Sequence, residues 1–144
     1  MPDESIGGPY VAVACLCEQV IEDKRGRFSF INLIDRLTIA TRDQASPEQM
    51  PAITLRAKAV LIFKSGFFRG PATVKLALRS PTEQIAGQSV FPVLFEGDDR
   101  GVAIVTNLNA ILQEEGLYWA DVYLQDQIVT RIPLRTIYQR VVTG

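Results

Sequence analysis

The feature that most constrains the fold is an alternation of apolar and polar side chains between residues 53 and 59, whose apolar face continues to residue 63. Apolar residues occupy every second position of this stretch: Ile53, Leu55, Ala57, Ala59, Leu61 and Phe63. A period of two is typical of a β-strand with one face buried and the other in water. Since no stretch longer than about ten residues keeps a clean helical period, the sequence predicts an all-β protein.

The same pattern predicts eight strands joined by turns and short loops. The expected strands are 10–21, 28–40, 53–63, 74–79, 84–95, 102–111, 118–124 and 128–140. Segments 64–71 and 97–101 are expected to be connections, and the polar loop 41–51 has room for one helical turn. Pro133 indicates that the last strand lies at an edge or carries a bulge. Short strands with hairpin turns favour a two-layer antiparallel β-sandwich, with a closed β-barrel as the alternative.

Tyr118 favours an immunoglobulin-like form of this sandwich. It stands at the start of the penultimate expected strand, two residues after Gly116. In immunoglobulin-like domains a tyrosine at this place bonds back to nearby backbone and forms a tyrosine corner. A plain buried tyrosine is the alternative interpretation. The 144 residues suit one domain over 1–144, with residues 1–8 as a loose lead-in.

The distribution of charge argues against nucleic acid as a partner. The chain has 15 basic and 16 acidic residues, and they are mixed along its length rather than gathered in runs. Binding to nucleic acid needs several Lys and Arg on one face. The acidic start and the short apolar runs predict neither a signal peptide nor a membrane span, so we expect a cytoplasmic protein.

The lack of histidine narrows the chemistry that the chain can perform. Histidine is the commonest general base and the commonest zinc ligand, and this sequence has none. Cys15 and Cys17 are the only cysteines, and on a strand their side chains would run parallel, which suits two buried apolar residues better than a metal site. We therefore expect no catalytic residues, no metal and no cofactor, and not an enzyme.

Two segments are candidates for an interaction surface. Trp119, Asp121 and Tyr123 share the nominally wet face of one expected strand, and Arg131 and Arg135 flank Pro133 on the next. Large aromatics beside charged residues are common at interfaces, although a covering loop would explain them equally well. Phe67 and Phe68, which lie between Gly66 and Gly70, either cap the end of the core or project toward a partner.

Two stretches carry a resemblance to a known group of proteins. The string from Gly116 to Leu124 followed by 131–134, together with the opening 15–18 and 28–35, resembles an uncharacterised family of short bacterial proteins of unknown function. The resemblance implies a β-sandwich of bacterial, cytoplasmic origin. It implies no catalytic residue, cofactor or substrate.

The sequence thus leads to one main functional hypothesis and two alternatives. The main hypothesis is a non-enzymatic protein-interaction module, either a homodimer or an accessory subunit with an unknown protein partner. The first alternative is a calcium- or lipid-binding sandwich that uses Asp98, Asp99 and the Phe67–Phe68 tip. The second is a carbohydrate-active domain that depends on paired carboxylates.

Overall fold

The computed structural model describes residues 7–41 and 48–140, and these residues form an all-β fold without a helix. Seven strands follow one another: β1 Tyr10–Glu22, β2 Phe28–Leu33, β3 Arg36–Thr41, β4 Ile53–Arg79, β5 Ile85–Leu112, β6 Gly116–Leu124 and β7 Gln127–Arg140. The all-β prediction is confirmed. The predicted helical turn in the loop 41–51 falls largely on residues 42–47, which lie outside the described residues.

The strands form one open sheet in the order β2-β1-β4-β6-β7-β3, and β5 pairs with β4 apart from this path. Every pairing is antiparallel except that of β3 with β7, which is parallel. The expectation of a wholly antiparallel fold is therefore wrong, because the chain crosses from β2 to the far side of β7. The sheet is open, which contradicts the closed alternative, and an immunoglobulin-like topology is not confirmed.

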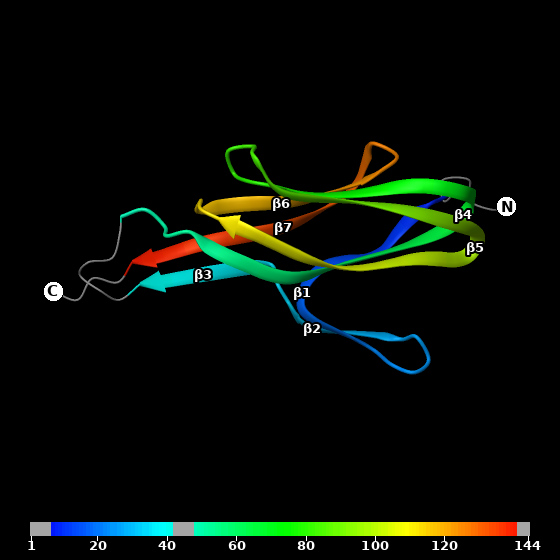
Figure 1. The fold of residues 1–144 in the computed structure, drawn as a ribbon, viewed down its shortest axis with the longest axis horizontal. Helices are drawn as coiled ribbons and strands as arrows, with labels where there is room; N and C mark the ends of the chain where they lie inside the picture. Colours follow the sequence, from blue (N-terminus) through cyan, green and yellow to red (C-terminus); the bar gives the residue numbers. More distant parts are fainter. Residues whose placement is uncertain (1–6, 42–47, 141–144) are drawn as a thin grey trace.

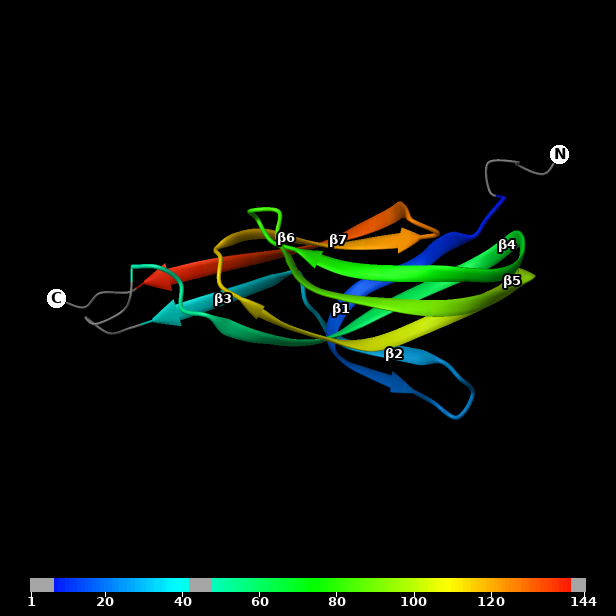
Figure 2. The ribbon, with the colours of Figure 1, turned by 45° about the horizontal axis from the view of Figure 1, so that its top comes forward.

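The two longest strands, β4 and β5, stay paired and bend together near their middle, so that the sheet folds over on itself (Figures 1 and 2). Their ladder continues through the fold with register shifts between Lys64 and Arg69. Gly66 and Gly97 take the turn there with φ of 60° and 93°, a left-handed region that glycine enters without steric cost. Segments 64–71 and 97–101 are thus parts of continuous strands rather than connections, so the predicted count of eight strands is wrong.

A single apolar core joins the two halves of the folded sheet. The first half of β4 pairs with β1, and the second half pairs with β6. Phe63 and Phe95, one from each half, meet edge to face with ring centroids 6.3 Å apart. The largest fully buried side chains come from both halves: Tyr118, Phe63, Phe95, Leu16, Leu61, Leu76, Leu78, Leu112, Leu134, Val60, Val74 and Val122.

The segment after the first hairpin differs most from the sequence prediction. The hairpin itself is confirmed, because Asp23 N donates to Arg27 O at 2.9 Å and Gly26 has a φ of 76°. The single expected strand 28–40, however, divides at Ile34 and Asp35 into β2 and β3. There Ile34 N donates to Leu16 O at 2.8 Å, and Asp35 O accepts from Arg135 N at 3.0 Å. These two bonds join the segment 34–35 to β1 on one side and to β7 on the other.

Tyr118 makes a hydrogen bond to nearby backbone, and Pro133 lies where β7 has a neighbouring strand on one side, β6. The hydroxyl of buried Tyr118 accepts a hydrogen bond from Glu114 N, four residues upstream, at 3.2 Å. Pro133 pairs with Trp119 in a part of β7 that precedes its pairing with β3, which begins at Arg135. Among the described residues, no strand pairs with β7 at Pro133 on the side away from β6. The missing N–H of the proline therefore breaks no hydrogen bond of the sheet there.

Candidate functional site

The outer face of the β4-β6-β7 half of the sheet carries the residues that sequence reasoning singled out. Trp119, Asp121 and Tyr123 alternate along β6 with side chains that face the core. Across the ladder, Trp119 lies opposite Pro133, and Asp121 lies opposite Arg131. We call this surface the Trp119 face and define it by Trp119, Asp121, Tyr123, Arg131 and their β4 neighbours Lys75 and Arg79.

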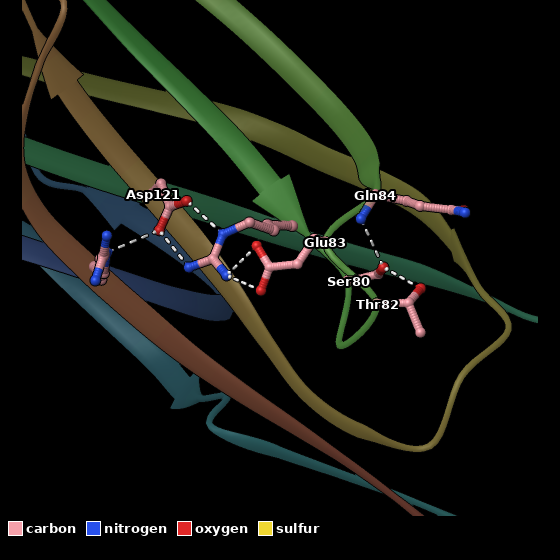
Figure 3. Close-up of polar contacts among 7 residues, drawn as sticks. Ser80, Thr82, Glu83, Gln84 and Asp121 are labelled. Atoms are coloured by element: carbon pink, nitrogen blue, oxygen red, sulfur yellow. Dashed lines mark hydrogen bonds and ion pairs between the residues drawn. The ribbon is translucent and has the colours of Figure 1, made fainter.

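Asp121 lies at the centre of the Trp119 face and is only 2% exposed. Its Oδ2 accepts a hydrogen bond from Arg79 Nε at 2.9 Å, and its Oδ1 lies 3.3 Å from Arg131 Nε. Figure 3 shows Asp121 with both sets of contacts. Sequence reasoning placed Asp121 on the contact surface, but the structure buries it beneath the two arginines that it holds.

Arg79 is held from two sides and carries the network toward the turn after β4. Its Nη1 lies 2.9 Å from Glu83 Oε1, and the hydrogen bond that it donates to Asp121 raises the pKa of the guanidinium. The turn is closed by Ser80, whose Oγ accepts from Gln84 N at 3.1 Å and lies 3.2 Å from Thr82 Oγ1 (Figure 3). The Arg79 side chain, 20% exposed, is therefore held in place by Asp121 and Glu83.

Cationic side chains outnumber carboxylates on and beside this face. Lys75 Nζ lies 4.4 Å from the centre of the Tyr123 ring, a cation–π contact between β4 and β6. Arg135 follows Arg131 and Pro133 along the exposed positions of β7, and its register partner on β3 is Arg36. Five cations lie on or beside the outer side of this half-sheet: Arg36, Lys75, Arg79, Arg131 and Arg135. Asp121 and Glu83 are the carboxylates that contact Arg79, and Asp35 lies beside Pro133 at the start of β3.

Sequence reasoning missed Lys75, Arg79 and Arg36. Lys75 and Arg79 alternate with the apolar residues Val74, Leu76 and Leu78, which is typical of an outward face, yet the pairing of β4 with β6 cannot be read from that alternation. Arg36 reaches this side only through the parallel pairing of β3 with β7. The position of Asp121 between Trp119 and Tyr123 was the available signal in the sequence, because a carboxylate that large aromatics shield from water needs cationic partners.

The two phenylalanines of the bend have different environments. Phe68 packs edge to face on Phe95, with ring centroids 5.7 Å apart, and so caps the core. Phe67 is 71% exposed and projects, and its backbone N–H donates to Gly7 O at 2.7 Å. The structure does not bring Phe67 and the Trp119 face together, since Phe67 lies at the bend of β4, outside its pairing with β6.

Cys15 and Cys17 are free thiols on β1, where Cys17 is buried and Cys15 is half-buried. Cys15 lies opposite Val60 and Cys17 opposite Lys58 on β4. Burial raises the pKa of both thiols above the ordinary value for cysteine. A raised pKa lowers the thiolate fraction at neutral pH, so neither sulfur is activated for attack on a substrate.

The acidic residues of the described segments do not form a metal site. Asp98 Oδ2 lies 3.3 Å from Arg69 Nη2 at the bend. A surface depression is lined in part by Glu48, Glu114 and Glu115, and Glu115 Oε1 accepts from Tyr138 N at 3.3 Å. Within residues 7–41 and 48–140, no three Cys, Asp or Glu side chains are grouped to hold a metal ion. The same residues contain no helix that is long and apolar enough to cross a membrane.

Neither the scan against protein-family models nor the search of curated proteins found a match for this sequence.

Proposed function

We propose that this protein is a non-enzymatic interaction module that docks an acidic surface of a protein partner on the Trp119 face. The observation that carries the proposal is the placement of Arg79 and Arg131 on buried Asp121 between two half-buried aromatics. Binding surfaces concentrate their affinity in a few Trp, Tyr and Arg side chains, and this face offers four such residues together.

Preorganisation supports this function. A free arginine loses much side-chain entropy when a partner fixes it, and that loss weakens binding. Here Asp121 already fixes one edge of Arg79 and of Arg131, with Arg131 remaining 50% exposed. Each guanidinium has five N–H donors, so donors remain for a carboxylate of the partner.

The sign of the charge supports an acidic partner. Five cations lie on or beside this face, and the carboxylate at its centre, Asp121, is buried, although the chain as a whole has a net charge of −1. Complementary charge guides association and excludes partners of like charge. We also propose that the two halves of the folded sheet act as the layers of a sandwich, which the Phe63–Phe95 contact supports.

Quantitative affinity capture with matched variants tests the proposal. Wild-type protein is compared with Trp119→Ala and Arg131→Glu, and with Lys24→Glu as a control for charge reversal in the β1–β2 hairpin, remote from the Trp119 face. We expect one acidic protein to be retained by the wild type and the control and lost from both face variants. Titration with the purified partner should then show affinity that weakens as salt is raised. Equal capture by all four proteins, or a salt-independent affinity, would contradict the proposal.

A further inference from the structure

A gap in the sheet separates β3 from the first residues of β4. β1 lies beside β4 only as far as Cys17, which pairs with Lys58. Beyond Cys17 the strand continues into the β1–β2 hairpin, which projects from the body of the molecule (Figures 1 and 2). No other strand of the described residues takes its place. Residues 53–57 of β4 therefore have a neighbouring strand on the β5 side and none on the other side.

The gap is one strand wide where it begins. At that point β1 lies between β4 and the segment that follows β2. Leu16 pairs with Ala59 on one side, and Leu16 O accepts from Ile34 N at 2.8 Å on the other. The chain then runs from Ile34 into β3, which follows β7. The place that β1 occupies between Ile34 and β4 is therefore left empty between β3 and residues 53–57.

A cavity of about 440 Å³ lies in this empty place. It is lined by Ile34 and Leu37 on one side and by residues 53–56 on the other, with Glu18 at the start of the hairpin. We call it the β3–β4 groove. Its floor is apolar, because Leu55 belongs to the core, and Leu37 and Ile53 pack against the core. The volume lies in the range of ligand-binding sites.

Backbone groups of β4 face the groove without a partner strand. Leu16 turns its polar groups away from β4, so the adjacent pair of Cys17 and Lys58 carries the hydrogen bonds between β1 and β4. Neighbouring residues of a strand point these groups to opposite sides. The N–H and C=O groups of Thr54 and Arg56 therefore point in the direction of Lys58, which at their level is the groove.

Backbone groups of β3 face the groove from the other side. Asp35 O accepts from Arg135 N of β7 at 3.0 Å, so the odd-numbered residues of β3 bond to β7. The even-numbered residues, Arg36, Thr38 and Ala40, then point their N–H and C=O groups to the groove. Two edges with free donors and acceptors thus border one place for a strand, and such edges accept an extended chain.

The sequence of β1 explains why this strand leaves the groove. Continued in its register with β4, β1 would place Glu18 opposite Ala57 and then Glu22 opposite Ile53. Both positions of β4 face the core, where a carboxylate without a cation is costly. The hairpin instead leaves both carboxylates exposed, and Glu18 Oε2 accepts from Asn32 Nδ2 at 2.9 Å. A segment that fills the groove needs apolar side chains at these two positions.

We infer that the β3–β4 groove binds an extended segment of a protein partner in which an acidic side chain lies between two apolar ones. The apolar side chains face the floor at Leu37 and Leu55, and the acidic one faces outward. Two exposed cations complement it there: Arg56, which lines the groove, and Arg36, which directly precedes Leu37. The inference does not depend on the Trp119 face, because the groove lies between β3 and the start of β4.

Peptide binding measured by fluorescence polarisation tests the alternation. The probe is a labelled peptide of sequence Thr-Val-Asp-Val-Thr, which in extended form has two valines on one face and the aspartate on the other. The control peptide, Val-Val-Asp-Thr-Thr, has the same composition and one valine on each face. We expect the probe to bind at least about tenfold more tightly, because both of its valines can be buried. Equal affinities, or no binding of the probe, would overturn the inference.

Charge reversal tests the acidic side chain. Arg56→Glu should weaken binding of the probe at least about tenfold and should favour a peptide with lysine in place of the aspartate. Lys64→Glu is the matched control, since Lys64 lies on the same outer face of β4 where β1 still pairs with it. Equal weakening by the two variants would contradict the inference. Loss of the probe in Trp119→Ala, with none in Arg56→Glu, would place the peptide on the Trp119 face and would overturn the groove while leaving the proposed function intact.

Amide hydrogen exchange locates the bound peptide. The amides of Thr54, Arg56 and Thr38 should exchange fast in the free protein and slowly with the probe bound. The amide of Leu55, which bonds to β5, should be protected in both states. Slow exchange of Thr54 and Arg56 without the peptide would show that the groove is already filled, by the chain itself or by a second copy. That result would rule out a partner segment.

Discussion

Asp121 differs from the other carboxylates in the described parts of the chain because it is buried and contacts two arginines. Moving a carboxylate out of water is costly, and only opposite charges and hydrogen bonds in the right geometry offset that cost. Arg79 and Arg131 provide them at 2.9 Å and 3.3 Å. Asp121 therefore holds the two arginines in place on the outer side of β6.

Neutralising Asp121 should lower the free energy of unfolding. Asp121→Asn keeps the shape but leaves the partly buried Arg79 without its main counter-charge, for which we expect a loss of about 2–3 kcal/mol in urea denaturation. Asp98→Asn is the matched control, since Asp98 also pairs with an arginine but its side chain is 73% exposed. The control should change stability by less than about 1 kcal/mol. Equal effects would show that Asp121 is not a buried charge.

The two cysteines make stability depend on pH on the alkaline side. Burial raises the pKa of Cys15 and Cys17 in the folded chain. The stabilising contribution of the two thiols to the free energy of unfolding is therefore fully present below the pKa of an unfolded cysteine, about 8.5. It is lost as pH rises through the higher folded values, because the unfolded state then releases protons first. We expect the free energy of unfolding to fall more steeply above this pH in the wild type than in Cys15→Ala, Cys17→Ala. Parallel pH profiles for the two proteins would contradict the shift.

At the scale of the element, the bend of β4 and β5 depends on close backbone contact. A Cβ at Gly101 would lie 2.3 Å from Phe63 O, whereas a Cβ at Gly87, on the same strand, meets nothing closer than 3.9 Å. Gly101→Ala should destabilise the protein by roughly 1–3 kcal/mol in thermal or urea unfolding, since the backbone must shift. Gly87→Ala should be neutral or stabilising by up to about 1 kcal/mol. A neutral Gly101→Ala would show that the contact is not tight.

The elements also show how far the sequence could lead. Alternation located the strands that contain Leu55 and Leu76, and it placed Trp119 and Tyr123 on the outer face. It could not distinguish a turn between two strands from a bend within one continuous strand. Glycines with a positive φ, such as Gly66 and Gly97, are suited to both structures. It could not foresee the parallel pairing of β3 with β7 either, since register between strands about a hundred residues apart is set by the whole core.

At the scale of the whole molecule, the folded sheet has two halves but one core, so the two halves should unfold together. The chain contains natural probes in each half: Trp119, its single tryptophan, lies on β6, and the buried thiol of Cys17 lies on β1. We expect tryptophan fluorescence and thiol reactivity to report the same denaturation midpoint, as cooperative unfolding requires.

Leu61→Ala provides the sharper form of this prediction. Leu61 is fully buried in the half that holds β1, and its truncation should lower stability by about 2–5 kcal/mol. Because Phe63 and Phe95 join the halves, the loss should move both midpoints equally, including that of the distant Trp119. Val129→Ala, at a site 39% exposed, is the control and should leave both midpoints nearly unchanged. A thiol midpoint that falls while the tryptophan midpoint stays would show that the two halves of the sheet are separate folding units.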